Sequence, residues 1–132
     1  RIARYWKHKA GTPEHVGFEC DTREQWENVF KPSLLNNALQ FDLADLKRRY
    51  AWCREQGFWT YLPSVEAFEE TRSMMGDEIT LMAMAEDPEW VIDVSRTFTD
   101  VVLANLQAVL DAGVDVDGIW IYGDMAFKTA TM

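Results

Sequence analysis

The sequence predicts an α/β protein with parallel strands that are separated by helices. Three observations carry this prediction: amphipathic segments with helical spacing, short apolar or aromatic segments that suit strands, and the alternation of the two along the chain. Strands that alternate with helices pair in parallel through right-handed crossovers. The chain has 132 residues, 48% of them hydrophobic, which suffices for one domain with a core.

Capping residues and glycines divide the chain into its predicted elements. Ser, Thr and Asp side chains accept hydrogen bonds from the free amides of a first helical turn, and Gly suits the left-handed position that ends many helices. The predicted N-caps are Thr22, Asp42, Ser64, Asp77 and Asp87, and the predicted helix ends are Gly57, Gly76 and Gly113. In chain order, we expect an extended segment at 16–20, helices at 22–30 and 43–56, a strand at 58–62, helices at 65–75, 78–85 and 88–112, and a strand at 118–122.

Local patterns support several of these elements. Thr22 and Gln25 have the spacing of a capping box, and Pro32 either ends that first helix or begins a new turn. The segment 58–62 is aromatic and β-branched, which is typical of strands. The segment 118–122 is apolar on both faces, which predicts a parallel strand that is buried on both sides.

Composition and charge exclude several classes of function. The net charge of −9 argues against a surface that binds nucleic acid or an anionic membrane. No apolar run approaches ~18 residues and no signal peptide is present, so we expect no membrane insertion and a cytoplasmic location. Cys20 and Cys53 are expected to be reduced thiols. His8, His15, Glu19 and Cys20 are zinc-binding residue types, but their spacing fits no compact zinc motif.

The first candidate site lies at the carboxyl end of the last predicted strand. The carboxyl ends of parallel strands are where α/β enzymes usually place their chemistry. Tyr122 and Asp124 lie at this end, and Gly123 allows a sharp turn or the close approach of a ligand. A structural role for Asp124, as a helix cap or hydrogen-bond acceptor, is the alternative. Lys128 follows, either as a partner for an anionic ligand or as an exposed loop residue.

The second candidate site lies where the strand 58–62 runs into a helix. Trp59 and Thr60 precede the predicted helix start, whose free amides can hold an anion. The alternative is that the aromatic residues belong to the core and that Ser64 is an ordinary cap.

Four segments, in this order and spacing, resemble the uroporphyrinogen decarboxylase superfamily. They are Gly57-Phe-Trp-Thr60, Phe68-Glu-Glu through Met74-Met-Gly76, Glu86-Asp-Pro-Glu89, and Ala112-Gly-Val-Asp115 to Gly123-Asp-Met-Ala126. The chain departs from the decarboxylases at Phe58, where they have Pro, at Ser64, where they have Tyr, and at Met125, where they have Ser. The stretch from Asp124 to Lys128 resembles the methyltransferase-like members more closely.

The resemblance implies a (β/α)₈, or TIM, barrel, a fold that needs ~250 residues. Residues 1–132 would form a central part of such a domain, about three βα units, truncated at both ends. The activity implied is that of a lyase of porphyrin biosynthesis, which decarboxylates tetrapyrrole acetate or propionate side chains without a cofactor. The alternative within the family is a methyltransferase that takes methyl from a corrinoid protein with the help of zinc.

The resemblance also implies where the working residues lie. The family's catalytic Asp precedes this chain and its zinc ligands follow it, so we expect catalytic residues and any zinc outside the chain, and no activity from the chain alone. Asp124, Trp59, Thr60 and Tyr122 are expected to bind substrate. The expected partners are a tetrapyrrole, a corrinoid or a corrinoid protein, and the full-length parent is expected to form a homodimer.

A different class of function also fits the residues. The chain can be a small non-catalytic α/β binding module, with a partner surface built on exposed aromatic side chains. In either case a sheet of two or three parallel strands leaves edges and faces uncovered. We therefore expect exposed apolar surface and poor solubility.

Overall fold

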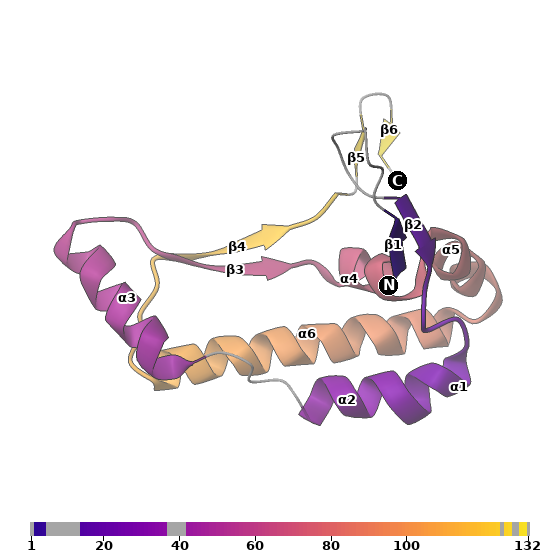
Figure 1. Ribbon diagram of the computed structural model, residues 1–132, viewed down its shortest axis with the longest axis horizontal. Helices are drawn as coiled ribbons and strands as arrows, with labels where there is room; N and C mark the ends of the chain where they lie inside the picture. The colour runs from indigo at the N-terminus through magenta and orange to yellow at the C-terminus, as the bar shows by residue number, and fades with distance from the viewer. Residues whose placement is uncertain (1, 5–13, 37–41, 125, 128–129, 132) are drawn as a thin grey trace.

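The structure is a computed structural model that describes residues 2–4, 14–36, 42–124, 126–127 and 130–131 (Figure 1). Its elements are β1 (Ile2–Arg4), β2 (Glu14–Gly17), α1 (Arg23–Gln25), the π-helical turn η1 (Trp26–Phe30), α2 (Lys31–Asn36), α3 (Leu43–Glu55), β3 (Tyr61–Val65), α4 (Ala67–Met75), α5 (Asp77–Glu86), α6 (Pro88–Asp111), β4 (Gly118–Tyr122), β5 (Ala126–Phe127) and β6 (Ala130–Thr131).

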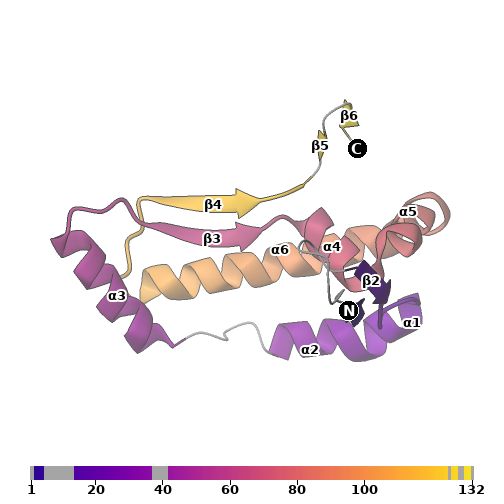
Figure 2. The same ribbon diagram turned by 45° about the horizontal axis from the view of Figure 1, so that its top comes forward.

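The predicted α/β class and the predicted parallel pairing are confirmed. β3 and β4 form a parallel pair, in register from Tyr61 opposite Gly118 to Val65 opposite Tyr122. The helices α4, α5 and α6 make the connection between the two strands. Figures 1 and 2 both show α6 running along one face of the pair, with α3 at the amino end of the pair, beside the carboxyl end of α6. The strands β1 and β2, and likewise β5 and β6, pair as separate antiparallel ribbons.

The hydrophobic core lies around the amino-terminal half of α6. Side chains from the N-terminal helical segment, α4 and α5 pack there against that helix, with Phe98 among the partly buried neighbours. The buried cluster consists of Cys20, Trp26, Met75, Ala83, Trp90, Val91 and Val94. Burial raises the pKa of the Cys20 thiol to about 11, with a smaller contribution from Asp21. This cysteine is therefore protonated at neutral pH, and it is unreactive as a nucleophile.

Several predicted helix ends are confirmed. The side chain of Thr22 accepts from the Gln25 amide, that of Asp42 from two amides of α3, and that of Asp87 from the Trp90 amide. Positive φ angles occur at the three glycines that were predicted to end helices, Gly57, Gly76 and Gly113. The first helical segment extends past its predicted end at 30. Lys31 N–H bonds to the Trp26 carbonyl in a widened turn, and α2 continues through Pro32 to Asn36.

Four predicted boundaries are wrong. The extended segment predicted at 16–20 is β2, which lies at 14–17. The second is Tyr61–Val65 rather than 58–62, so Ser64 is a strand residue and not a helix cap. The cap of α4 is Glu66, whose longer side chain reaches the amides of Phe68 and Glu69 at 2.8 and 2.6 Å. Asp77 is the first residue of α5, after Gly76.

The prediction that the last strand is buried on both faces is also wrong. From Ile119 to Tyr122 the exposed fractions are 47, 60, 63 and 51%. The reason is that helices cover only one face, and that within the described residues no third strand joins the β3–β4 sheet. The expected exposed apolar surface is thereby confirmed.

The longest helix, α6, has 24 residues and carries several charged side chains. In the part of the chain that the structure describes, no helix is both long and apolar enough to cross a bilayer.

Gly76 provides a test of the fold between α4 and α5. Its φ of +87° and ψ of 158° are open essentially to glycine alone, and an added Cβ would lie 2.6 Å from the Phe18 ring. We predict that Gly76→Ala lowers the free energy of unfolding by about 2–4 kcal/mol. Gly57→Ala is the control: its φ is +71°, no atom lies within 4 Å of the added Cβ, and its cost should be about 1 kcal/mol. Urea unfolding followed by circular dichroism measures both, and equal losses would contradict the structure.

Candidate ligand-binding face

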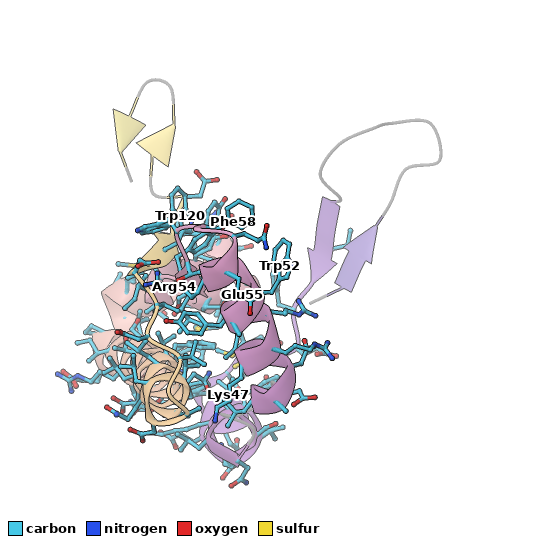
Figure 3. The ribbon with its side chains drawn as sticks, turned by 90° about the vertical axis from the view of Figure 1, so that its left-hand side faces the viewer. Lys47, Trp52, Arg54, Glu55, Phe58 and Trp120 are labelled. Atoms are coloured by element: carbon cyan, nitrogen blue, oxygen red, sulfur yellow. The ribbon has the colours of Figure 1, made fainter. Side chains whose placement is uncertain are left out.

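The face of the β3–β4 pair that points away from α6 is aromatic and uncovered. Side chains alternate between the two faces of a strand. Ile119 and Ile121 line a groove against α6, so Trp120 and Tyr122 point to the opposite side. Figure 3 looks at the α3 end of the molecule and shows Trp120 and Phe58 together on that side. We call the surface formed by Trp59, Tyr61, Pro63, Trp120 and Tyr122 the aromatic face.

Three rings of the aromatic face form a row. The ring centroids of Trp59 and Tyr61 are 5.6 Å apart, with their planes 30° from parallel. Those of Tyr61 and Trp120 are 6.1 Å apart, with their planes tilted by 50°. These rings are about half exposed or more, with exposed fractions of 62, 48 and 60%. These mutually tilted, exposed rings offer apolar surface that a ligand or another apolar chain can cover.

The structure places Trp59 and Thr60 before β3, at the amino end of the pair. The Trp59 ring lies 2.7 Å from where a Cβ on Gly118 would stand, so it packs over the start of β4. The amide and hydroxyl of Thr60 both donate to Asp117, at 2.8 and 2.9 Å. Arg54 donates to the same carboxylate at 2.8 Å. The polar groups of Thr60 are thus engaged in holding the amino ends of the strands together.

Tyr122 and Asp124 lie at the other, carboxyl end of the pair. The Tyr122 carbonyl accepts from the Glu66 amide at 2.8 Å, and its side chain is half exposed. Asp124 follows the strand and is exposed. Thr60 lies five residues before Val65, and Val65 is the β3 partner of Tyr122. In extended chain this separates Thr60 from the Tyr122 end by about 16 Å. The four residues that we expected to bind substrate therefore form two separate pairs.

Tyr61 and Trp120 bridge these two ends. Tyr61 belongs to the strand of the second candidate site, but neither residue was among those that we expected to bind substrate. Their contact depends on the register of β3 and β4, which no local pattern reveals. The period-two alternation of the strand predicted at 118–122 could have identified Trp120, because Trp120 shares a face with Tyr122. The remaining sequence candidates lie elsewhere. The side chains of His8, His15 and Lys128 all lie outside the part of the chain that the structure describes.

The carboxyl end of the pair carries several charged groups from α4, α5 and the chain after β4. Arg72 donates to Asp77 at 2.5 Å and to Glu69 at 3.1 Å. These contacts raise the pKa of Arg72. The hydrogen bond that Arg72 donates to Asp77 has the largest effect, and the charge of Asp124 contributes. Glu66 is occupied with the amides of α4. Carboxylates thus outnumber the one guanidinium in this described cluster, and its potential is negative.

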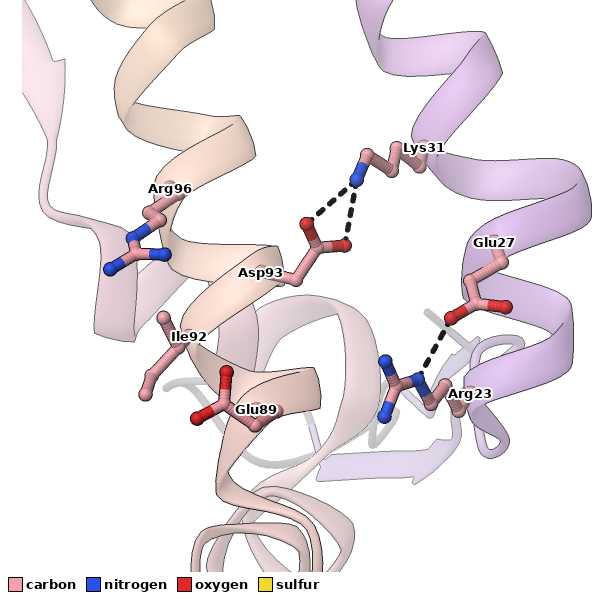
Figure 4. Close-up of a pocket in the computed structure, with 7 residues that line it drawn as sticks. All are labelled: Arg23, Glu27, Lys31, Glu89, Ile92, Asp93 and Arg96. Atoms are coloured by element: carbon pink, nitrogen blue, oxygen red, sulfur yellow. Dashed lines mark hydrogen bonds and ion pairs between the residues drawn. The ribbon is translucent and has the colours of Figure 1, made fainter.

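A second concave site is polar and lies between the N-terminal helical segment and α6. This groove of about 460 Å³ is lined by Arg23, Glu27, Lys31, Glu89, Ile92, Asp93 and Arg96. Figure 4 shows the Lys31 ammonium bound to Asp93 across it. The indole of Trp26 donates to the same carboxylate at 2.7 Å. Three cations face three carboxylates, so the groove is electrically balanced, and its bonds attach the first helices to α6.

Among the described side chains, no group of three His, Cys, Asp or Glu is placed to hold a metal ion. Cys20 and Cys53 are free thiols. Comparisons with protein-family models, with curated proteins and with solved structures found no significant match to the chain.

The lowered pKa values of Asp93 and Asp117 make the free energy of unfolding depend on pH. Burial alone would raise the pKa of Asp93, but hydrogen bonds from Lys31 and Trp26 outweigh it and lower that pKa below 3.8. Hydrogen bonds from the Thr60 amide and hydroxyl, and then from Arg54, lower the pKa of Asp117. A carboxylate whose pKa is lower in the folded protein than in the unfolded chain stabilises the fold at any pH above its unfolded pKa. This stabilisation is lost as the pH falls through the folded pKa.

We therefore predict that the free energy of unfolding falls as pH decreases below about 4. Asp93→Asn should flatten this fall, because the asparagine cannot take up the proton. Asp100→Asn, at an exposed position on α6, is the control and should leave the profile unchanged. Urea unfolding between about pH 5 and pH 3 measures all three proteins. An Asp93→Asn profile as steep as that of the wild type would rule out this carboxylate as a source of acid sensitivity.

Proposed function

We propose that β3 and β4 are adjacent strands of a (β/α)₈ barrel of the uroporphyrinogen decarboxylase superfamily, and that residues 1–132 form part of that domain. One observation supports this most: a parallel pair has helices on one face and an exposed aromatic face on the other. Barrel strands have this arrangement, with helices outside and the inner face turned toward the remaining strands. The order of the family-like segments described above adds to this support.

The proposed ligand site lies at the carboxyl end of the pair. Substrates of such barrels bind at this end, and the residues there are Tyr122 and Asp124. In our proposal the carboxylate of Asp124 accepts a hydrogen bond from an N–H of the ligand, and Tyr122 and Trp120 stack against its rings. Trp59 and Thr60 take a structural role instead, because their contacts hold the opposite end of the sheet.

The local charge distinguishes two ligand classes. Uroporphyrinogen is a polycarboxylate, and the negative potential around Glu69, Asp77 and Asp124 opposes its approach. A corrinoid carries neutral amides at its edge and meets no such penalty. We therefore propose a corrinoid, free or carried by a protein, as the partner, and methyl transfer rather than decarboxylation as the reaction of the full domain. A cytoplasmic location is part of the proposal, and it suits the free thiols of Cys20 and Cys53.

Calorimetric titration of ligands into the protein tests this function. The domain is expressed with any sequence that adjoins it in its reading frame, and hydroxocobalamin and uroporphyrin are titrated separately. We predict saturable binding of the cobalamin and none of the porphyrin. Asp124→Asn should weaken cobalamin binding about tenfold, because one charge-assisted hydrogen bond becomes a weaker neutral one.

The control is Glu89→Gln, which removes an exposed carboxylate in the polar groove along α6. Its affinity for the cobalamin should equal that of the wild type. Preferential binding of the uroporphyrin would contradict the choice of ligand. Cobalamin binding that is insensitive to Asp124→Asn would contradict the assigned site.

A further inference from the structure

The helix α5 is apolar on two opposite sides, but only one of them is covered. Ile79 and Ala83 pack toward the hydrophobic core. On the other side, Leu81 and Met82 are 57 and 49% exposed, and Ala85 is exposed beside them. A helix that is apolar all round is normally buried all round. The exposed side of α5 therefore has the composition of a contact surface.

This surface lies beyond the ends of the parallel strands. The β3–β4 ladder ends where Val65 pairs with Tyr122. Figures 1 and 2 both show α5 past these carboxyl ends, near the start of α6. Closure of the proposed barrel adds strands and helices alongside β3, β4 and the part of α6 that covers them. The exposed side of α5 therefore stays accessible when the barrel is closed.

Two carboxylates stand at the ends of this exposed side. Glu78 lies one helical turn before Met82 and Glu86 lies one turn after it, so the three residues form a stripe about 12 Å long. Within the described part of the chain, neither carboxylate has a hydrogen-bond or ion-pair partner. The helix itself contains no lysine or arginine. Glu86 also stands at the carboxyl end of α5, where the helix dipole favours a cation.

A concave acidic site continues the stripe toward the start of α6. It is a groove of about 240 Å³, and Met82, Glu86, Asp21, Asp87 and Arg23 are among the residues that line it. Three carboxylates thus face one guanidinium, and Arg23 already donates to Asp87 at 3.1 and 3.0 Å. The groove keeps a net negative charge, so it suits the ammonium or guanidinium group of a partner.

From these observations we propose that the exposed side of α5 binds a basic amphipathic helix of a partner protein. Apolar side chains of that helix cover Leu81, Met82 and Ala85. Its lysine or arginine side chains pair with Glu78 and Glu86, and one of them enters the acidic groove. Methionine suits such a contact, because its flexible side chain adapts to the shape of a partner.

The charge of the whole chain favours this class of partner over others. A net charge of −9 attracts a basic segment, and it opposes the approach of an anionic membrane or of a second copy. The proposal does not depend on the ligand or on the reaction proposed above, because α5 contributes no residue to that site.

Fluorescence anisotropy with a labelled model peptide tests this surface. The peptide is an amphipathic helix of leucine and lysine, and it is compared with a peptide in which glutamate replaces every lysine. The domain is expressed with any sequence that adjoins it in its reading frame. We expect saturable binding of one lysine peptide per chain, which weakens with added salt, and no binding of the glutamate peptide.

Substitutions on α5 locate the contact. Leu81→Lys should weaken binding of the lysine peptide at least about tenfold, because it places a like charge in the apolar contact. Glu86→Gln should weaken it about fivefold, the equivalent of one exposed ion pair. The matched controls are Leu110→Lys, at an exposed position near the far end of α6, and Glu55→Gln, at an exposed position on α3. Both change the net charge equally and should bind like the wild type.

Circular dichroism verifies that each variant is folded. The proposal is overturned if the lysine peptide does not bind, if the folded Leu81→Lys and Glu86→Gln variants bind it like the wild type, or if the two controls are equally impaired. Self-association of the protein without peptide, abolished by Leu81→Lys, would assign this side of α5 to a second copy and would also overturn the proposal.

Discussion

The parallel pairing of β3 with β4 is the contact on which the rest of the structure depends. It joins segments that are separated in the chain by α4, α5 and α6, and it places α6 along one face of the sheet. Two bonds secure its ends: the Asp117 amide donates to the Thr60 carbonyl, and the Glu66 amide donates to the Tyr122 carbonyl. The side chain of Asp117 adds contacts to Thr60 and Arg54. Every candidate ligand contact is positioned by this ladder.

The buried core and the exposed aromatic face lie in two different regions of the molecule. The buried cluster around Trp26 and Val94 lies at the amino-terminal half of α6, where side chains from the N-terminal helical segment, α4 and α5 pack against that helix. The parallel pair lies further along the same helix and is covered on one face only. Aromatic side chains such as Trp120 are well suited to contacts with a partner or ligand, because each buries a large area with few rotatable bonds. The uncovered aromatic face of the pair is therefore the surface from which we infer function.

Local chemistry made much of the fold predictable. The N-caps at Asp42 and Asp87 and the glycines after α3, α4 and α6 have their effect within a few residues, and the sequence reveals them directly. The position of β3 is different. Pro63 is compatible with a strand only because its missing N–H faces a free edge, and this depends on which strands pair. Similarly, the separation of Thr60 from Asp124 and the contact of Tyr61 with Trp120 follow from the register of two segments distant in the chain.

The central claim is that β3 and β4 pair in parallel, in the register that sets Tyr61 opposite Gly118 and Val65 opposite Tyr122. Residue-resolved amide hydrogen exchange tests it most directly. The Trp120 and Tyr122 amides, which face β3, should exchange slowly. Fast exchange of these two amides in the folded protein would contradict the account.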